Sequence, residues 1–294
     1  MLISYYMKKL CYIIIFIFSI TLVAAKLPVK ITLTYNPKQG TSSVYEMHVK
    51  SFLTLNNINL KAVDLKLQNF ITYMDFIFTN TVDKTANDGS ITETLTYNSF
   101  KLEQEIMGMR TPINMGFDLA GKSFKTTTSK DGKLKDSKGF EQLAPTLQDL
   151  RLDNFFLQIN PVFPQKAVKV GDAWNNETNS SLPIKNSLVK TNLKSTYTLQ
   201  GFEKTGIHNC VIVGIAVNIN TETIPVQQEH LDYVVDVTIN GTGAGKILYD
   251  YEQSRIISSQ ITMNLKSIIK TTADTGISKL DTDQRVEMNL KLTK

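Results

Sequence analysis

Hydrophobic and polar residues alternate along most of the chain beyond residue 25. An apolar side chain at every second position gives an extended strand one buried face and one wet face. Strands of this kind are typical of antiparallel sheets, because parallel sheets are usually covered on both faces. The clearest apolar rows are Val29, Ile31, Leu33 and Tyr35; Tyr233, Val235, Val237 and Ile239; Ile257, Ile261, Met263 and Leu265; and Val286, Met288, Leu290 and Leu292.

Short polar segments between these rows favour tight turns. Asn87-Asp88-Gly89 and Asp131-Gly132 carry the Asp-Gly step that is common in β-hairpins. The segment from Tyr251 to Ser254 separates two further strands in the same way. Turns this short leave no room for a crossover helix, so we expect the flanking strands to be antiparallel neighbours.

The glycine-rich stretch Gly241-Thr-Gly243-Ala-Gly245 interrupts one predicted strand. Its spacing departs from the G-x-G-x-x-G pattern of dinucleotide-binding loops, and the following residues continue as a strand instead of a helix. We therefore expect a bend or a bulge within the sheet.

One segment breaks the alternation. From Ser137 to Ile159 the apolar residues recur at spacings of three and four, which predicts one helix or two short ones. Pro145 lies inside this segment and disfavours a single continuous helix. The segment ends at Asn160-Pro-Val-Phe-Pro164, which indicates a helix stop followed by an extended connector.

These patterns predict a mainly β (α+β) fold. It is either one long, curved antiparallel sheet or two β-rich halves that are joined and partly covered by a short helical segment. We divide the chain into a signal peptide (1–25), a first β-rich half (26–136), a helical bridge with a proline-rich connector (137–164) and a second β-rich half (165–294). An internal duplication of the two halves is a hypothesis.

Residues 1–25 differ from the rest of the chain. Lys8 and Lys9 precede an apolar run from Leu10 to Ala25 that closes on small residues, as in a secretory signal peptide cleaved near Ala25. A retained membrane anchor is the alternative, but a spanning helix needs roughly 20 apolar residues, more than this run provides. We therefore expect an extracytoplasmic protein, periplasmic or secreted, with no transmembrane segment in the mature chain.

The mature chain is close to neutral. Loss of Lys8 and Lys9 lowers the formal net charge from +5 to +3, and the remaining cations are interspersed with Asp and Glu. This distribution argues against a nucleic-acid partner. Cys210 is the one cysteine after residue 25, so no internal disulfide is expected, and its apolar neighbours predict a buried core thiol and not a nucleophile.

The sequence contains no H-E-x-x-H, G-x-S-x-G, Walker or EF-hand motif. His48, His208 and His230 lack metal-ligand spacing to one another or to cysteine. We therefore expect no metal, no cofactor and no enzymatic activity.

The segment from Phe70 to Phe78 is apolar on both faces of a predicted strand. One interpretation is a strand covered on both sides, between the sheet and the helical bridge. The other is that one face lines a cavity for an apolar ligand. Asp75 would lie close to this apolar surface and would need a partner. The candidate ligand-binding residues are Phe70, Met74, Phe76 and Phe78, together with Phe155 and Phe156 of the helical bridge.

Pro161-Val-Phe-Pro164 leads into the pattern V-x-V-G-D-x-W, which ends at Trp174, and a later strand pair contains G-x-G-x-x-x-Y-D-Y-E. With the Asp-Gly hairpins, these motifs resemble a family of secreted bacterial β-rich proteins catalogued as a domain of unknown function, over most of residues 30–270. The resemblance implies an envelope protein and no particular activity. From the residues themselves, Gly171-Asp172 predicts a tight turn and Trp174 a structural anchor, with ligand stacking by Trp174 as the alternative.

Three functions are compatible with these features. The first is a non-enzymatic protein whose curved sheet shelters an apolar small molecule or lipid. The second is a structural or adhesive module that binds a protein or glycan along an exposed strand edge. The third is a hydrolase whose site gathers distant carboxylates in one cleft. A hollow inner face favours the first function, and a filled one favours the second.

Overall fold

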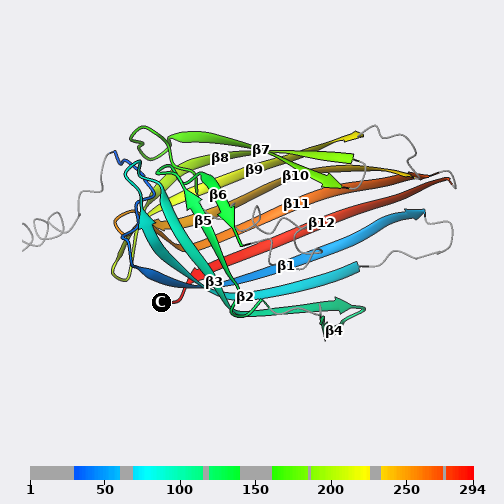
Figure 1. Ribbon diagram of the computed structural model, residues 1–294, viewed down its shortest axis with the longest axis horizontal. Helices are drawn as coiled ribbons and strands as arrows, with labels where there is room; N and C mark the ends of the chain where they lie inside the picture. Colours follow the sequence, from blue (N-terminus) through cyan, green and yellow to red (C-terminus); the bar gives the residue numbers. More distant parts are fainter. Residues whose placement is uncertain are drawn as a thin grey trace, which may run out of the picture.

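Figure 1 shows the computed structural model, which describes residues 30–59, 69–114, 119–139, 161–184, 187–225, 233–273 and 276–294. Within these ranges the chain forms strands and no helix. The strands are β1 (Ser42–Asn59), β2 (Asn69–Thr85), β3 (Ile91–Ile106), β4 (Met109–Pro112), β5 (Ser123–Thr128), β6 (Leu134–Lys138), β7 (Ala173–Ile184), β8 (Ser187–Thr205), β9 (His208–Pro225), β10 (Tyr233–Asp250), β11 (Arg255–Ala273) and β12 (Gly276–Leu292).

All twelve strands belong to one antiparallel sheet. Its order is β6-β5-β3-β2-β1-β12-β11-β10-β9-β8-β7, with β4 paired to β3. From β7 to β12 and from β1 to β3, consecutive strands are neighbours. β5 pairs with β3, and at the centre β1 pairs with β12 along most of its length. The prediction of one long antiparallel sheet is therefore confirmed, and the two β-rich halves share it.

The long strands give the sheet its curvature. β8 and β11 have 19 residues each, so each extends for about 60 Å at the usual rise per residue. Strands twist right-handedly, and twist accumulated over such lengths makes an open sheet coil. Figure 1 shows the sheet as a curved wall with the strands running along its long axis.

Loops close one end of this wall. The backbone N–H of Phe163, ahead of β7, donates to the carbonyl of Asp131 in the β5–β6 turn, with 2.8 Å between N and O. Ile31 and Val168 exchange two backbone hydrogen bonds of 2.8 Å. The segments that precede β1 and the two edge strands, β6 and β7, thus meet at this end.

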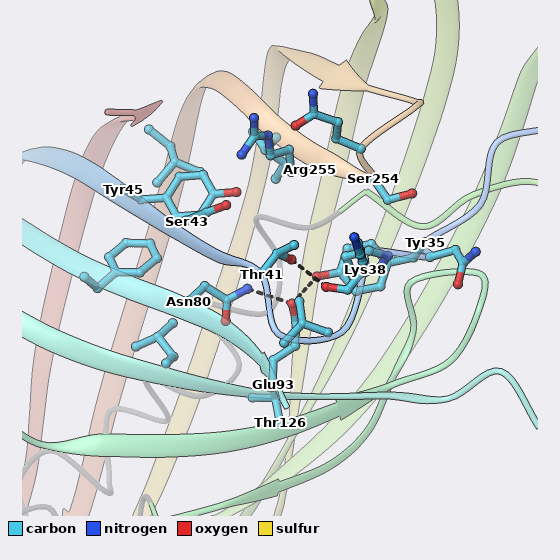
Figure 2. A pocket seen from close by; sticks show the side chains of 18 of the residues that line it. Tyr35, Lys38, Thr41, Ser43, Tyr45, Asn80, Glu93, Thr126, Ser254 and Arg255 are labelled. Atoms are coloured by element: carbon cyan, nitrogen blue, oxygen red, sulfur yellow. Dashed lines mark hydrogen bonds between the residues drawn. The ribbon is translucent and has the colours of Figure 1, made fainter. Parts of the chain in front are cut away.

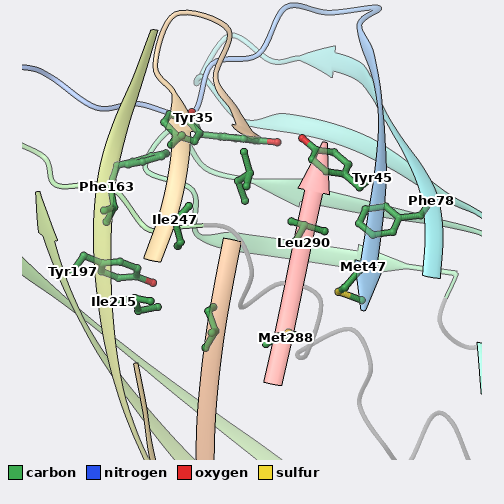
Figure 3. Close-up of a cluster of buried hydrophobic side chains, with 14 of the residues drawn as sticks. Tyr35, Tyr45, Met47, Phe78, Phe163, Tyr197, Ile215, Ile247, Met288 and Leu290 are labelled. Atoms are coloured by element: carbon green, nitrogen blue, oxygen red, sulfur yellow. The ribbon is translucent and has the colours of Figure 1, made fainter. Parts of the chain in front are cut away.

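We define the inner face as the face that carries the main hydrophobic cluster. Directly paired residues on it include Met47 with Phe76 on one side and with Leu290 on the other. Figure 3 shows side chains of this cluster converging from strands of both halves. Its fully buried members include Met47, Ile91, Leu199, Val211, Val213, Ile247 and Tyr249.

The outer face is mainly polar. Its one apolar cluster among the described residues consists of Cys210, Leu248 and Ile257, with Ile212 and Leu292 against it. Ile257 was predicted to share a face with Ile261, and this is wrong: the β10–β11 register shifts between Leu248 and Tyr249, which moves Ile257 to the outer face.

The glycines of β10 fit a continuous strand. Pairing with both neighbours passes through Gly241, Gly243 and Gly245 without a register shift, so the bulge expected there as one alternative is absent. A Cβ at Gly243 would lie 2.8 Å from the Cγ of Met263, because side chains of β11 lean over the glycines. Glycine is therefore required here for close approach of β11.

The three predicted turns are confirmed. Gly89 (φ +77°) and Gly132 (φ +83°) adopt left-handed conformations in the β2–β3 and β5–β6 turns, and residues 251–254 connect β10 to β11. The predicted helical segment receives no support. Ser137 and Lys138 belong to β6, where they pair with β5, and residues 140–160 lie outside the described residues. Residues 1–25 also lie outside them.

Among the described residues, no helix has the length and apolar character needed to cross a membrane.

Candidate functional site

A pocket of about 380 Å³ lies at the closed end of the inner face. It is bounded by β1, β2, β3 and β5, by residues 35–41 ahead of β1, and by the β10–β11 turn with the start of β11. This volume is within the usual range for small-molecule sites. Figure 2 shows its lining side chains, which come from both halves of the chain.

Aromatic rings form much of the pocket wall. Tyr45 and Phe78 stack with ring centroids 5.4 Å apart, and Tyr97 meets Phe124 edge-on at 5.5 Å. Leu95 is half-buried beside them. Cross-strand pairing explains the arrangement, because Phe78 is directly opposite both Tyr45 on β1 and Tyr97 on β3. This part of the pocket suits an apolar chain or ring.

A buried carboxylate interrupts the apolar wall. Glu93 is 2% exposed, and its Oε1 accepts hydrogen bonds from the Tyr35 hydroxyl (2.6 Å) and the Asn80 amide (2.7 Å). Burial raises the pKa of Glu93, since water no longer stabilises its charge, and the two hydrogen bonds act in the opposite direction. Burial also raises the pKa of Tyr35 well above its usual value, so this phenol stays a proton donor.

A cation lines the same pocket. Arg255 is half-buried at the start of β11, and its buried Nε has no hydrogen-bond partner among the described residues. Figure 2 shows Arg255 and Glu93 reaching the pocket from different strands. A buried donor without a partner costs about 1–3 kcal/mol. An acceptor atom on a ligand would remove this cost.

The β10–β11 turn is fixed by Asp250, which is completely buried. Its Oδ1 accepts from the backbone N–H groups of Glu252 and Gln253, each at 3.0 Å. Its Oδ2 lies 2.8 Å from Nδ1 of His208. These contacts hold the turn that leads into Arg255, so Asp250 positions one wall of the pocket.

Asp250 and His208 also lie close to Cys210, which bears on the role of this cysteine. Asp250 is directly opposite Cys210 in the β9–β10 pair, so a carboxylate and a histidine do lie nearby. However, burial and then the Asp250 charge raise the pKa of the thiol to about 11, and Cys210 is 1% exposed. The prediction of a buried core cysteine is confirmed.

The predicted ligand-binding residues are only partly gathered at this pocket. Phe78 lines it, and Phe76 packs beside Phe100 and Tyr97 on the same face. Phe70 and Met74 lie farther along β2 on the inner face, opposite Leu53 and Val49 of β1. Phe155 and Phe156 lie outside the described residues.

The interpretation that β2 is covered on both sides is wrong. Ile77 is 38% exposed on the outer face. Asp75 lies on that outer face as well, and its Oδ1 is 2.6 Å from Nδ1 of His48 on β1. The partner that Asp75 needs is thus a neighbouring surface residue.

Sequence reasoning missed Glu93 and Arg255. Glu93 carried a usable signal, because it occupies an apolar position in the alternation Ile91, Glu93, Leu95, Tyr97. An acidic residue in such a row is exceptional and marks either strain or a site. Arg255 had no comparable signal, since it follows a polar turn.

Trp174 has a structural role. Its indole Nε1 donates to the carbonyl oxygen of Val162 at 2.6 Å, and its ring stacks on Tyr197 with 5.7 Å between centroids. Gly171 has a φ of +92° in the turn before it. The predicted turn and anchor are therefore confirmed, and Trp174 does not line the pocket.

Within the described ranges, no group of three or more His, Cys, Asp or Glu residues is placed to hold a metal ion. The fold and the pocket define a class: a single curved antiparallel sheet with a ligand-sized pocket at one end of its inner face.

Comparison with known proteins finds one family model that matches part of the chain. The model described as "Family of unknown function (DUF6263)" matches residues 146–256. This confirms the predicted resemblance to a family catalogued as a domain of unknown function over residues 146–256, and not over the wider range 30–270. The matched range contains the V-x-V-G-D-x-W connector, β7 to β10 and the turn that carries Arg255. No curated protein compared with the chain matches it.

Proposed function

We propose that this protein binds an apolar ligand with an acidic end group, such as a fatty acid, outside the cytoplasm and without catalysing a reaction. The observation that carries the proposal is one pocket of about 380 Å³ that combines an aromatic wall with the Nε of Arg255, which has no partner within the described part of the chain. The signal-peptide pattern of residues 1–25 supports the location. The lack of catalytic motifs in the sequence supports a binding role.

The aromatic wall accounts for the apolar part of the ligand. Burial of apolar surface stabilises a complex by about 25 cal/mol per Å². Tyr45, Phe78, Tyr97 and Phe124 hold one another in place through ring contacts, so little side-chain entropy is lost when a ligand binds. The inner face continues beyond the pocket along Phe76 and Met74, which extends the apolar surface available to a long chain.

Arg255 accounts for the acidic end. A guanidinium prefers carboxylate or phosphate oxygens, with which it forms charge-assisted hydrogen bonds. Glu93 already accepts two hydrogen bonds on Oε1 and is more readily protonated than an ordinary carboxyl group. Glu93 therefore repels a ligand carboxylate less than an ordinary, fully ionised glutamate would.

Fluorescence titration of the delipidated protein with a fluorescent fatty acid tests the apolar part. Leu95→Trp fills the pocket and should weaken binding by about tenfold or more, since the displaced ligand atoms lose their contacts. Leu102→Trp is the matched control, because Leu102 lies on the same strand opposite Met74 and outside the pocket. Equal affinities for both variants and the unaltered protein would contradict the proposed site.

A fatty acid and its alcohol analogue, compared in Arg255→Gln, test the acidic end. Loss of a charge-assisted hydrogen bond costs about 1.5–3 kcal/mol, so fatty-acid affinity should fall by about 10–150-fold while the affinity for the alcohol changes little. Arg285→Gln, on the outer face, is the control. An equal loss for both ligands would remove Arg255 from the proposed role. Native mass spectrometry of protein from its own host would identify a resident ligand.

A further inference from the structure

A second cavity, a trench of about 770 Å³, crosses the outer face of the sheet. Its lining residues come from five neighbouring strands, two from β1 and three each from β9, β10, β11 and β12. Its lining side chains alternate with inner-face residues such as Leu265 and Ile219, which places the trench on the side opposite to the ligand pocket.

Strand register explains how the trench forms. Directly paired residues line up in two parallel rows across the five strands. Between the rows lie Ile219, Gly241, Leu265 and Gln284, which also line the trench. One row is Asn218, Thr242, Asn264, Arg285 and Phe52, and the other is Asn220, Asn240, Lys266, Asp283 and Thr54. With strands about 4.8 Å apart, each row is about 19 Å long.

Four amides give the trench its chemistry. Asn218, Asn220, Asn240 and Asn264 are exposed, and within the described part of the chain none of their side chains has a hydrogen-bond partner. Each amide offers a donor and an acceptor. A sugar hydroxyl group also donates and accepts, so a row of amides matches a row of hydroxyl groups.

The charges in the trench largely cancel. Asp283 accepts a hydrogen bond from the amide of Asn56 at 2.7 Å, and Arg285 is paired with Glu287 at 2.7 Å. Lys266 is the remaining charged residue of the two rows. A polyanion requires several cations along its path, and this trench does not provide them.

The position of the trench argues against a peptide. Extended peptides bind mainly through backbone hydrogen bonds to a free sheet edge. Here the floor lies at the centre of the sheet, and its backbone is engaged in the ladders of β9 to β12. Recognition must come from the side chains. At the β1 end lies the half-buried ring of Phe52, with the Nζ of Lys50 4.5 Å from its centroid; the opposite ring face is apolar and suits the C–H face of a sugar.

We propose that the outer trench binds a linear, uncharged oligosaccharide, lying across the strands with its hydroxyl groups paired to the asparagine amides. An extended, β-linked chain fits a straight trench of this length. This site is separate from the inner pocket and does not depend on the proposed fatty-acid function.

Isothermal titration calorimetry of the full chain with cellohexaose and, separately, chitohexaose tests the proposal. We expect saturable binding of at least one of them with a Kd of about 1 mM or tighter. The triple variant Asn220→Ala, Asn240→Ala, Asn264→Ala should bind at least about tenfold more weakly, because three hydrogen-bonding groups are lost. Asn289→Ala should bind normally, since Asn289 is an exposed amide on β12 outside the trench.

Backbone amide shifts of the unaltered protein provide a readout that needs no variant. Shifts induced by the bound hexasaccharide should centre on residues 218–220, 240–242, 264–266 and 283–285. Absence of saturable binding to either sugar, unchanged affinity of the triple variant, or shifts confined to the inner face would each overturn the proposal. A fatty acid that leaves the sugar affinity unchanged would show that the two sites are independent, as expected.

Discussion

Replacement of Gly245 by alanine tests whether close approach of β11 to β10 holds the sheet together. A Cβ at this position would overlap the carbonyl oxygen of Gln260 and would lie 2.9 Å from the Cα of Ile261. Ordinary van der Waals contact begins at 3.4 Å, so β10 and β11 must separate locally by at least about 0.5 Å. Both obstructing atoms belong to the backbone, and no side-chain rotation can relieve the overlap.

The expected cost follows from this separation. Overpacking in a rigid interior costs about 1–3 kcal/mol, and weakening one or two ladder hydrogen bonds adds about 1 kcal/mol each. We therefore expect Gly245→Ala to lower the free energy of unfolding by about 2–4 kcal/mol. Urea titration followed by the fluorescence of Trp174, the only tryptophan, measures it.

Gly201→Ala is the matched control. Gly201 also lies in a long strand, β8, but a Cβ there would meet only the Cδ1 of Ile212, at 3.9 Å. Alanine also restricts the unfolded chain, so this variant should be unchanged or more stable by up to about 1 kcal/mol. A Gly245→Ala protein within about 0.5 kcal/mol of the original would refute the reasoning, because natural scatter at neutral sites has that size. So would an equal loss in the control.

Two further predictions concern buried titratable groups. Because burial raises the pKa of Glu93, the folded chain holds this proton to higher pH than the unfolded chain, and the free energy of unfolding should fall as pH rises above the ordinary carboxyl value. In Glu93→Gln, urea titrations at several pH values should show no such decline of the free energy of unfolding. An identical decline in the variant and the original protein would contradict this prediction. Cys210, with its pKa raised to about 11, should react with iodoacetamide only after unfolding. Peptide-resolved mass spectrometry measures this, and equal rates in folded and unfolded protein would disprove it.

Much of the sheet was predictable because strand alternation and turn chemistry are local properties. Asp-Gly steps and the segment 251–254 placed three hairpins correctly, and the V-x-V-G-D-x-W connector placed the turn before β7. The candidate site was predictable only in part. Phe78 was identified from its apolar strand, whereas the Glu93–Arg255 combination was not, because its members come from β3 and β11.

The sequence by itself determined much of the strand pattern, several of the tight turns and most of the side chains that share a face. It was wrong for the row from Ile31 to Tyr35, which lies ahead of β1 and forms no named strand, and for the face of Ile257. These features depend on neighbours within a few positions, since the period of two is a property of each strand alone. Only the tertiary structure decided that β1 pairs with β12, that both edge strands are linked at one end, and that two rows of polar side chains align into a trench. Twelve strands of similar pattern allow many orders, and the choice among them depends on the register and packing of the whole sheet.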